Sequence, residues 1–255
     1  MTVGLFIPCY INQFYPQVGI ATLELLEKHG VDVVYPRNQT CCGQPMANSG
    51  FEKESLETYK LFVENFHSYD YIVAPSGSCV YHVREHYTLL GQDKNVQRVR
   101  NNTYELCEFL IKILKKDRFN AEFPHRVGLH QSCHGLRGLH LGTPSERMSE
   151  KFTAKRHPVQ RDSFPRQLLN NVKGIQLVDL DRDDECCGFG GTFAVGEEAV
   201  SVKMGIDRIN DHLSHHAEVI TATDMSCLMH LEGIIRRRKL PVRVKHIAEI
   251  LNGTS

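Results

Sequence analysis

The sequence predicts an α/β protein made of two duplicated Rossmann-like halves, each with a parallel sheet. Short apolar runs alternate with segments of helical periodicity, which is the pattern of parallel strands joined by helical crossovers. The pattern Cys…Cys-Cys-Gly…Cys also occurs twice along the chain. The run from Val3 to Cys9 recurs, in spacing and partly in residue, from Val127 to Cys133. We therefore expect an internal duplication, with residues 1–118 in the first half and residues 119–255 in the second.

The first half is expected to alternate strands and helices from its first residues. Apolar β-branched runs define its strands, and Gly30 and Pro36 are typical residues for ending elements. The expected order is a strand over 3–7, a helix over 16–29, a strand over 31–35, a helix over 52–66, a strand over 71–74, a helix starting near Cys79 and a helix over 103–115.

The second half repeats this order with a longer first crossover over residues 135–173. The expected elements are a first strand within the run 127–133, strands over 175–180 and 219–222, and a helix over 197–213. The segment after its third strand, Thr223 to Cys227, matches Pro75 to Cys79 in position. Each Cys-Cys-Gly loop should then lie at the C-terminal edge of its sheet, where ligands bind in open α/β folds.

Composition excludes several classes of protein. Lys+Arg and Asp+Glu both total 30 in 255 residues, so the global charge gives no indication of nucleic-acid binding. No apolar run approaches the length of a membrane span, and the N-terminus resembles a first strand more than a signal peptide. Nine cysteines are an odd number in a chain without an export signal. We expect a cytoplasmic protein whose thiols bind metal or do redox chemistry.

The duplicated cysteines are the candidate metal ligands. Each follows a strand in the expected fold, and two of them begin helices, whose positive N-terminal ends favour thiolate. Four soft thiolates at one place select zinc, copper(I) or an iron–sulfur cluster. Cys107 is different, because it shares a helical face with apolar residues and has no counterpart in the other half. The ligand sets are Cys9, Cys41, Cys42 and Cys79 in the first half, and Cys133, Cys186, Cys187 and Cys227 in the second.

Polar residues near these cysteines have more than one interpretation. His82 and His230 lie three residues after Cys79 and Cys227, so we expect them to face the metal and hydrogen-bond a sulfur without ligating it. His134 is a third histidine of this kind. Asp224 either supplies an oxygen ligand or, as its place before a helix favours, caps that helix; Ser76 is open to the same interpretation. The basic stretch 145–166 is either a solvated helix face or a docking site for an acidic partner.

These residues alone do not separate zinc from iron. Zinc sites usually contain two short Cys-x-x-Cys units, and the sequence has none. A ferredoxin-type run is absent too, as are a dinucleotide fingerprint and a P-loop. A thiol–disulfide enzyme is disfavoured for lack of Cys-x-x-Cys. The remaining hypotheses are a redox subunit that works with partners, or a zinc-stabilised scaffold.

The motif set resembles the cysteine-rich CCG-domain family, which includes a cysteine-rich component of heterodisulfide reductase and the iron–sulfur subunit of glycolate oxidase. Full family motifs end in Cys-x-x-Cys, and here Ser76 and Asp224 stand at the first of those cysteines. This variant is similar to the lactate-utilisation branch of the family. The resemblance implies an iron–sulfur subunit, with a 4Fe-4S type cluster expected and zinc possible in one site, in a complex oxidising L-lactate to pyruvate. It also implies a ferredoxin-like iron–sulfur partner and a third subunit. A related glycolate-oxidase-like or heterodisulfide-reductase-like system is the alternative.

Overall fold

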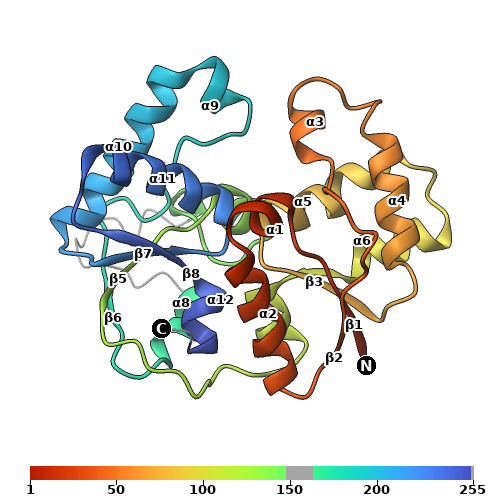
Figure 1. The fold of residues 1–255 in the computed structure, drawn as a ribbon, viewed down its shortest axis with the longest axis horizontal. Helices are drawn as coiled ribbons and strands as arrows, with labels where there is room; N and C mark the ends of the chain where they lie inside the picture. The colour runs from red at the N-terminus through yellow and green to blue at the C-terminus, as the bar shows by residue number, and fades with distance from the viewer. Residues whose placement is uncertain (148–162, 254–255) are drawn as a thin grey trace.

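A computed structural model describes residues 1–147 and 163–253 and shows two α/β lobes side by side (Figure 1). Each lobe contains a four-stranded sheet, in the orders β2-β1-β3-β4 and β6-β5-β7-β8. Every strand pairing in both sheets is parallel. The predicted fold class, two Rossmann-like halves with parallel sheets, is confirmed.

The first lobe follows the predicted alternation with several additional elements. The predicted helix over 103–115 begins instead with a fourth strand, β4, because residues 103–105 pair with β3 before the chain turns into α7. Helices α1, α3 and α6 and the short η1 were not predicted, and α4 begins later than the predicted residue 52. Its elements are β1 (Thr2–Leu5), α1 (Cys9–Phe14), α2 (Pro16–Lys28), β2 (Asp32–Val34), α3 (Gln44–Asn48), α4 (Leu56–Phe66), β3 (Tyr71–Ala74), α5 (Gly77–His86), η1 (Tyr87–Leu89), α6 (Lys94–Asn102), β4 (Thr103–Glu105) and α7 (Leu106–Lys112).

The second lobe repeats the order of the first. Its fourth strand and last helix were not predicted, and they correspond to β4 and α7 of the first lobe. Its elements are β5 (Arg126–Leu129), η2 (His134–Gly138), η3 (Ser145–Arg147), α8 (Phe164–Asn170), β6 (Gln176–Val178), α9 (Phe193–Gly196), α10 (Glu198–Ser214), β7 (Val219–Ala222), α11 (Met225–Arg238), β8 (Arg243–His246) and α12 (Ile247–Asn252). No helix within the described ranges is long and apolar enough to cross a membrane.

The last helix of each lobe packs against a helix of the other lobe as well as against its own sheet. Helix α12 packs against α2 of the first lobe (Figure 1), and α7 packs against α8 of the second. Asn252 joins α12 to α2, because its side-chain amide donates to Glu24 Oε2 at 2.6 Å and its Oδ1 accepts from Lys28 Nζ at 2.6 Å. One apolar core contains Leu25 of the first lobe and Leu251 of the second. The predicted boundary at residues 118 and 119 lies between the two sheets, but the lobes share this core.

Replacing Leu251 with Ala should lower the free energy of unfolding by about 3 kcal/mol, because it leaves a cavity in the shared core. Leu251 is 1% exposed. Both lobes should unfold in one transition when denaturation is followed by circular dichroism and by tyrosine fluorescence. Val200 on α10 is 51% exposed, so Val200→Ala should have little effect. Two separate transitions, with only the second lobe destabilised, would contradict the shared core.

Candidate metal centre

The four cysteines of the first lobe converge at the C-terminal edge of its sheet. Cys9 begins α1 after β1, Cys41 and Cys42 lie in the loop after β2, and Cys79 is the third residue of α5 after β3. The sulfurs of Cys9 and Cys41 are 3.6 Å apart, and those of Cys42 and Cys79 are 3.3 Å apart. The sulfurs of Cys41 and Cys42 are also in hydrogen-bonding contact. The four cysteines of this set therefore lie together at one edge of the sheet, with their sulfurs in two close pairs.

The second lobe arranges its four cysteines in the same way. Cys186 contacts the thiols of Cys133 and Cys187. Cys187 in turn contacts Cys227, the third residue of α11. All nine cysteines of the chain are free thiols, as expected for a metal-binding set. The four cysteines of this set therefore also lie together, after the strands of the second sheet.

A glycine shapes each Cys-Cys-Gly loop. Gly43 has φ 87° and Gly188 has φ 89°, a left-handed conformation that glycine adopts without steric cost. A Cβ on Gly43 would lie 2.5 Å from Tyr59, and one on Gly188 would lie 2.6 Å from the Ser201 carbonyl oxygen. Each glycine amide points at the sulfur two residues earlier, at 3.4 Å from Cys41 Sγ and Cys186 Sγ. The loops therefore hold two sulfurs together and supply an N–H donor to one of them.

Both cysteine sets open into a single cavity of about 130 Å³. The cavity lies between the lobes, and Tyr10 and Phe189, one from each lobe, also line it. Their rings meet edge to face with centroids 5.9 Å apart. Sequence reasoning missed both aromatic residues, although each lies within two positions of a cysteine. The two cysteine sets are therefore neighbours in one cavity. The duplication in the sequence did not indicate that they would be adjacent.

The crowded thiols divide into acidic and protonated members. Hydrogen bonds from Cys42 and Cys9 hold the pKa of Cys41 well below its usual value, and those from Cys133 and Cys187 do the same for Cys186. The donating thiols have raised pKa values, because each sits beside that thiolate and is desolvated. Each set thus contains one preferred thiolate, which is the form of cysteine that binds metal.

The donor set fits a metal. Two thiolates on one zinc ion stand about 3.8 Å apart, and the pairs Cys9–Cys41 and Cys42–Cys79 have separations close to this. In an iron–sulfur cluster the cysteines bind different iron ions, so the sulfurs would have to move apart. These cysteines are therefore positioned to bind a metal.

Asp224 caps two helices at once. Its Oδ1 accepts from the amide and hydroxyl of Ser226 at 3.3 and 2.6 Å, at the start of α11. Its Oδ2 accepts from the amide of Ser78 in α5 of the other lobe at 2.7 Å. Ser76 caps α5 through the amide of Cys79 at 3.4 Å. The capping interpretations of Asp224 and Ser76 are confirmed, and Asp224 also lines the cavity.

Replacing Asp224 with Ala should lower the free energy of unfolding by about 3 kcal/mol, since it leaves the buried Ser78 amide and the partly buried amide and hydroxyl of Ser226 without this acceptor. Ser76→Ala removes two longer contacts, with the Cys79 amide and the Ser78 hydroxyl, and should cost about 1 kcal/mol. Urea denaturation of the metal-free protein would measure both values. Equal losses of unfolding free energy in the two variants would show that the hydrogen bond from the Ser78 amide to Asp224, which joins the lobes, adds nothing to stability.

The histidines three residues after the helix cysteines find other partners. His82 Nε2 lies 2.9 Å from the Tyr59 hydroxyl, and His230 Nε2 lies 3.3 Å from the Ser201 carbonyl oxygen. Within the described part of the chain neither ring hydrogen-bonds a sulfur, because α4 and α10 present polar atoms closer to them. His134 is half-buried and lines the cavity, with its ring 5.2 Å from that of Tyr81.

Two other predictions concern residues away from the cavity. Cys107 is fully buried in the apolar core, as predicted. Most of the basic stretch 145–166 lies outside the described residues. Within it, Arg166 is buried and pairs with Asp179 at 3.3 Å.

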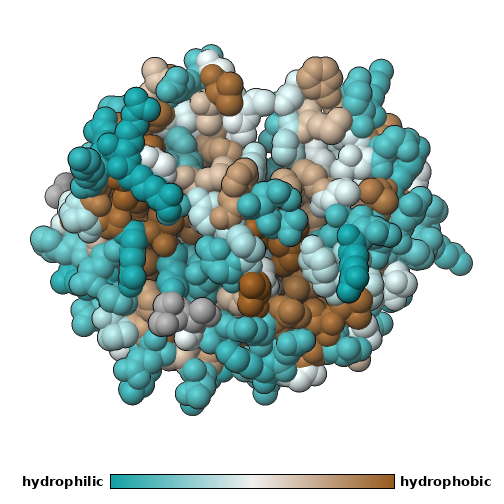
Figure 2. All heavy atoms as spheres, viewed as in Figure 1, coloured by the Kyte–Doolittle hydropathy of each residue, from teal (hydrophilic) through white to brown (hydrophobic). Residues whose placement is uncertain are grey.

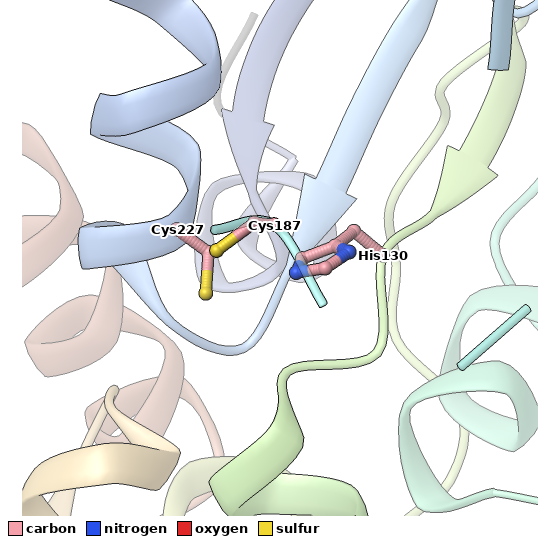
Figure 3. Close-up of side chains that lie close together, drawn as sticks. All are labelled: His130, Cys187 and Cys227. Atoms are coloured by element: carbon pink, nitrogen blue, oxygen red, sulfur yellow. The ribbon is translucent and has the colours of Figure 1, made fainter. Parts of the chain in front are cut away.

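Sequence reasoning missed one histidine beside the second cysteine set. His130 follows β5, is fully buried and lies with Cys187 and Cys227 so that the three potential ligand atoms are within 4.8 Å of one another (Figure 3). Burial lowers the pKa of His130 to about 3. One feature of the sequence could have pointed to His130. It matches Phe6 of the first half, so a polar residue occupies a strand end where the other half has an apolar one.

Fold and site together define a duplicated α/β protein whose two cysteine sets form a candidate metal centre. The family model described as the cysteine-rich CCG domain matches residues 3–84 and 127–232. The chain belongs to this family, and within it to the lactate utilization protein A family.

Curated relatives match over nearly their full length. "Lactate utilization protein A 1" of Bacillus mycoides is 37% identical over 257 residues, covering 99% of this chain and 97% of the relative. "Lactate utilization protein A" of an Exiguobacterium species is 39% identical over 257 residues, covering 98% and 96%. Among solved structures, a hypothetical protein from Helicobacter pylori matches with a TM-score of 0.60 and 8% identity, covering all of this chain and 49% of the other. This last similarity shows the fold alone.

Proposed function

We propose that this protein is the iron–sulfur subunit of a complex that oxidises L-lactate to pyruvate. One observation carries the proposal: two sets of four cysteines share one cavity in a chain whose relatives are named for lactate utilization. Oxidation of lactate to pyruvate releases two electrons. An iron–sulfur cluster, when bound, accepts and releases electrons singly. Two adjacent centres would therefore match the two electrons of one substrate molecule.

The chain's own residues would hold and tune such centres. The amides of Gly43 and Gly188 donate toward Cys41 and Cys186. Hydrogen bonds to sulfur stabilise its negative charge and shift the reduction potential upward. The rings of Tyr10 and Phe189 line the cavity that both sets share and contact each other edge to face. These features support electron transfer within the shared cavity.

Electron transfer onward needs partners, and we propose a ferredoxin-like iron–sulfur protein and a third lactate-utilisation subunit in the cytoplasm. Helices α3 and α9 form two arms, one on each lobe (Figure 1), and Asn48 of α3 and Gly191 before α9 line the cysteine cavity. Apolar side chains gather at the tips of these arms, with the surface hollowed between them (Figure 2). The exposed residues include Met46 and Phe51 at α3, and Phe193 and Val195 on α9. An exposed apolar surface of this kind beside the cysteine cavity is suitable for binding a protein partner.

A zinc-stabilised scaffold is the second candidate. Two sulfur pairs of the first set, 3.6 and 3.3 Å apart, have about the separation of two thiolates bound to one ion. Zinc has no redox change, so a protein containing only zinc would organise the complex without carrying electrons.

Metal analysis of protein purified without oxygen tests the proposal. We expect iron and acid-labile sulfide, a brown colour and an electron paramagnetic resonance signal after reduction. With the two partner proteins present, lactate should reduce these centres and glycolate should reduce them far less. Stoichiometric zinc in a colourless protein would support the scaffold instead. If glycolate reduces the centres faster than lactate does, the result would support the glycolate-oxidase-like alternative.

A further inference from the structure

The two lobes differ at one cluster of three matching positions. In the first lobe Phe6 packs edge to face against Phe62 and Phe66, with ring centroids 4.8 and 5.8 Å apart. The second lobe has His130, Arg208 and His212 at these places. The backbone confirms the first match, since the Phe6 amide donates to the third strand of its sheet at 2.9 Å and the His130 amide does so at 2.8 Å.

The helix positions confirm the other two matches. Ser55 and Ser201 both donate a hydroxyl to the carbonyl of the glycine in their own Cys-Cys-Gly loop. Phe62 and Phe66 lie seven and eleven residues after Ser55, and Arg208 and His212 lie seven and eleven residues after Ser201. An apolar aromatic cluster in one lobe is therefore a basic cluster in the other.

Contacts within the protein explain the buried Arg208, but they do not explain His130 or His212. All three side chains are fully buried. Arg208 pairs with Asp211 at 2.7 Å and donates to the Arg182 carbonyl. Both ring nitrogens of His130 lack a hydrogen-bond partner within the described ranges, and so do those of His212. Burying an imidazole without a hydrogen-bond partner costs free energy. The described residues around His130 supply no such partner, so its burial needs another explanation.

The cysteines give His130 a candidate ligand. Figure 3 shows one ring nitrogen of His130 facing the sulfurs of Cys187 and Cys227. The three donor atoms lie within 4.8 Å of one another. An ion bonded to all three would hold them about 3.6 Å apart, so movements on the order of 1 Å would complete the site. His212 has no such neighbouring pair of sulfurs among the described residues.

We infer that His130 supplies a nitrogen ligand to the metal centre of the second lobe, which is then a mixed sulfur–nitrogen centre while the first lobe's is bound by sulfur alone. The inference rests on the proposed metal centre. Phe6 occupies the equivalent position in the first lobe and offers no donor atom. A neutral imidazole ligand raises the reduction potential of an iron–sulfur centre relative to thiolate. The second centre should therefore have the higher potential of the two, which gives electrons a direction between the lobes.

Pulsed electron paramagnetic resonance on the intact, anaerobically purified and reduced protein tests this inference. The same measurement on protein reconstituted with Co²⁺ covers the case of native zinc. We expect a strongly coupled nitrogen whose signal changes when the protein is grown with ¹⁵N-histidine. This readout needs no substitution and does not depend on lactate oxidation.

Variants then assign the nitrogen. His130→Phe, which copies Phe6, should remove the coupling and lower the potential of one centre, and His130→Gln should do the same if the Phe variant misfolds. His212→Phe, which copies Phe66, should keep the coupling. A metal-loaded wild-type protein without nitrogen coupling, or coupling that survives in both His130 variants, would overturn the inference and leave the iron–sulfur proposal standing. Protein that binds no metal at all would overturn that proposal too.

Discussion

Lowering the pH by one unit should weaken metal binding at each cysteine set by about a hundredfold. Cysteine binds metal as thiolate, so every protonated thiol must release its proton when the ion enters. The pKa values of Cys9 and Cys42 are raised by their contacts with Cys41, so both are protonated near neutral pH in the metal-free protein. At least two protons then leave this set on binding, and each contributes a factor of ten per pH unit.

Titration of metal-free protein with Zn²⁺ against a chelator of known affinity, from pH 6 to pH 8, would measure this dependence. Calorimetry in buffers with different ionisation enthalpies counts the protons directly. Cys9→Ser should reduce the slope toward tenfold per pH unit, because it removes one ligand that must be deprotonated. Cys107→Ser should leave the slope unchanged. Affinity that does not depend on pH would show that the thiols are already ionised or are not the ligands.

The duplicated fold was predictable because its signals are local. A run such as Tyr71 to Ala74 is recognisable as a buried strand from its own residues. Strand β4 was missed because it has three residues and leads straight into α7, so the helical periodicity of the longer segment outweighed it. The packing of α12 and α7 against helices of the other lobe was not predictable. An amphipathic helix shows which face is buried, but not which neighbour covers it.

The metal centre was predictable within each lobe and not between lobes. Parallel strands bring their C-terminal ends to one edge, so the four positions of each cysteine pattern had to meet. How the two lobes face each other depends on the shared core, so the common cavity and the bond from Asp224 to Ser78 came only from the structure. His130 was missed for a related reason. Its role depends on being buried against Cys187, and a lone histidine at a strand end carries no such information in the sequence.

Replacing Cys187 with Ser should abolish lactate-dependent electron transfer in the reconstituted complex, by more than about a hundredfold. Cys187 is 3% exposed and lies in contact with Cys186, Cys227 and His130, at the centre of the second set. Serine supplies a harder oxygen ligand, whereas iron in a cluster prefers sulfur. Even the loss of a residue that only hydrogen-bonds a metal ligand typically lowers metal affinity or activity about 10–100-fold. The visible absorbance and the resonance signal of the second-lobe centre should disappear, while those of the first-lobe centre remain.

The controls separate loss of the centre from loss of the fold. Cys42→Ser, the matching change in the first lobe, should remove the other centre's signal and spare the second. Cys107→Ser changes a fully buried cysteine that does not line the cavity. This variant therefore shows what a loss of stability does when no metal ligand is lost. It should leave both spectra and the rate of lactate oxidation unchanged. If the complex containing Cys187→Ser oxidises lactate at the wild-type rate, the second set carries no electrons in turnover, and the zinc-stabilised scaffold becomes the better account of why that lobe keeps its four cysteines.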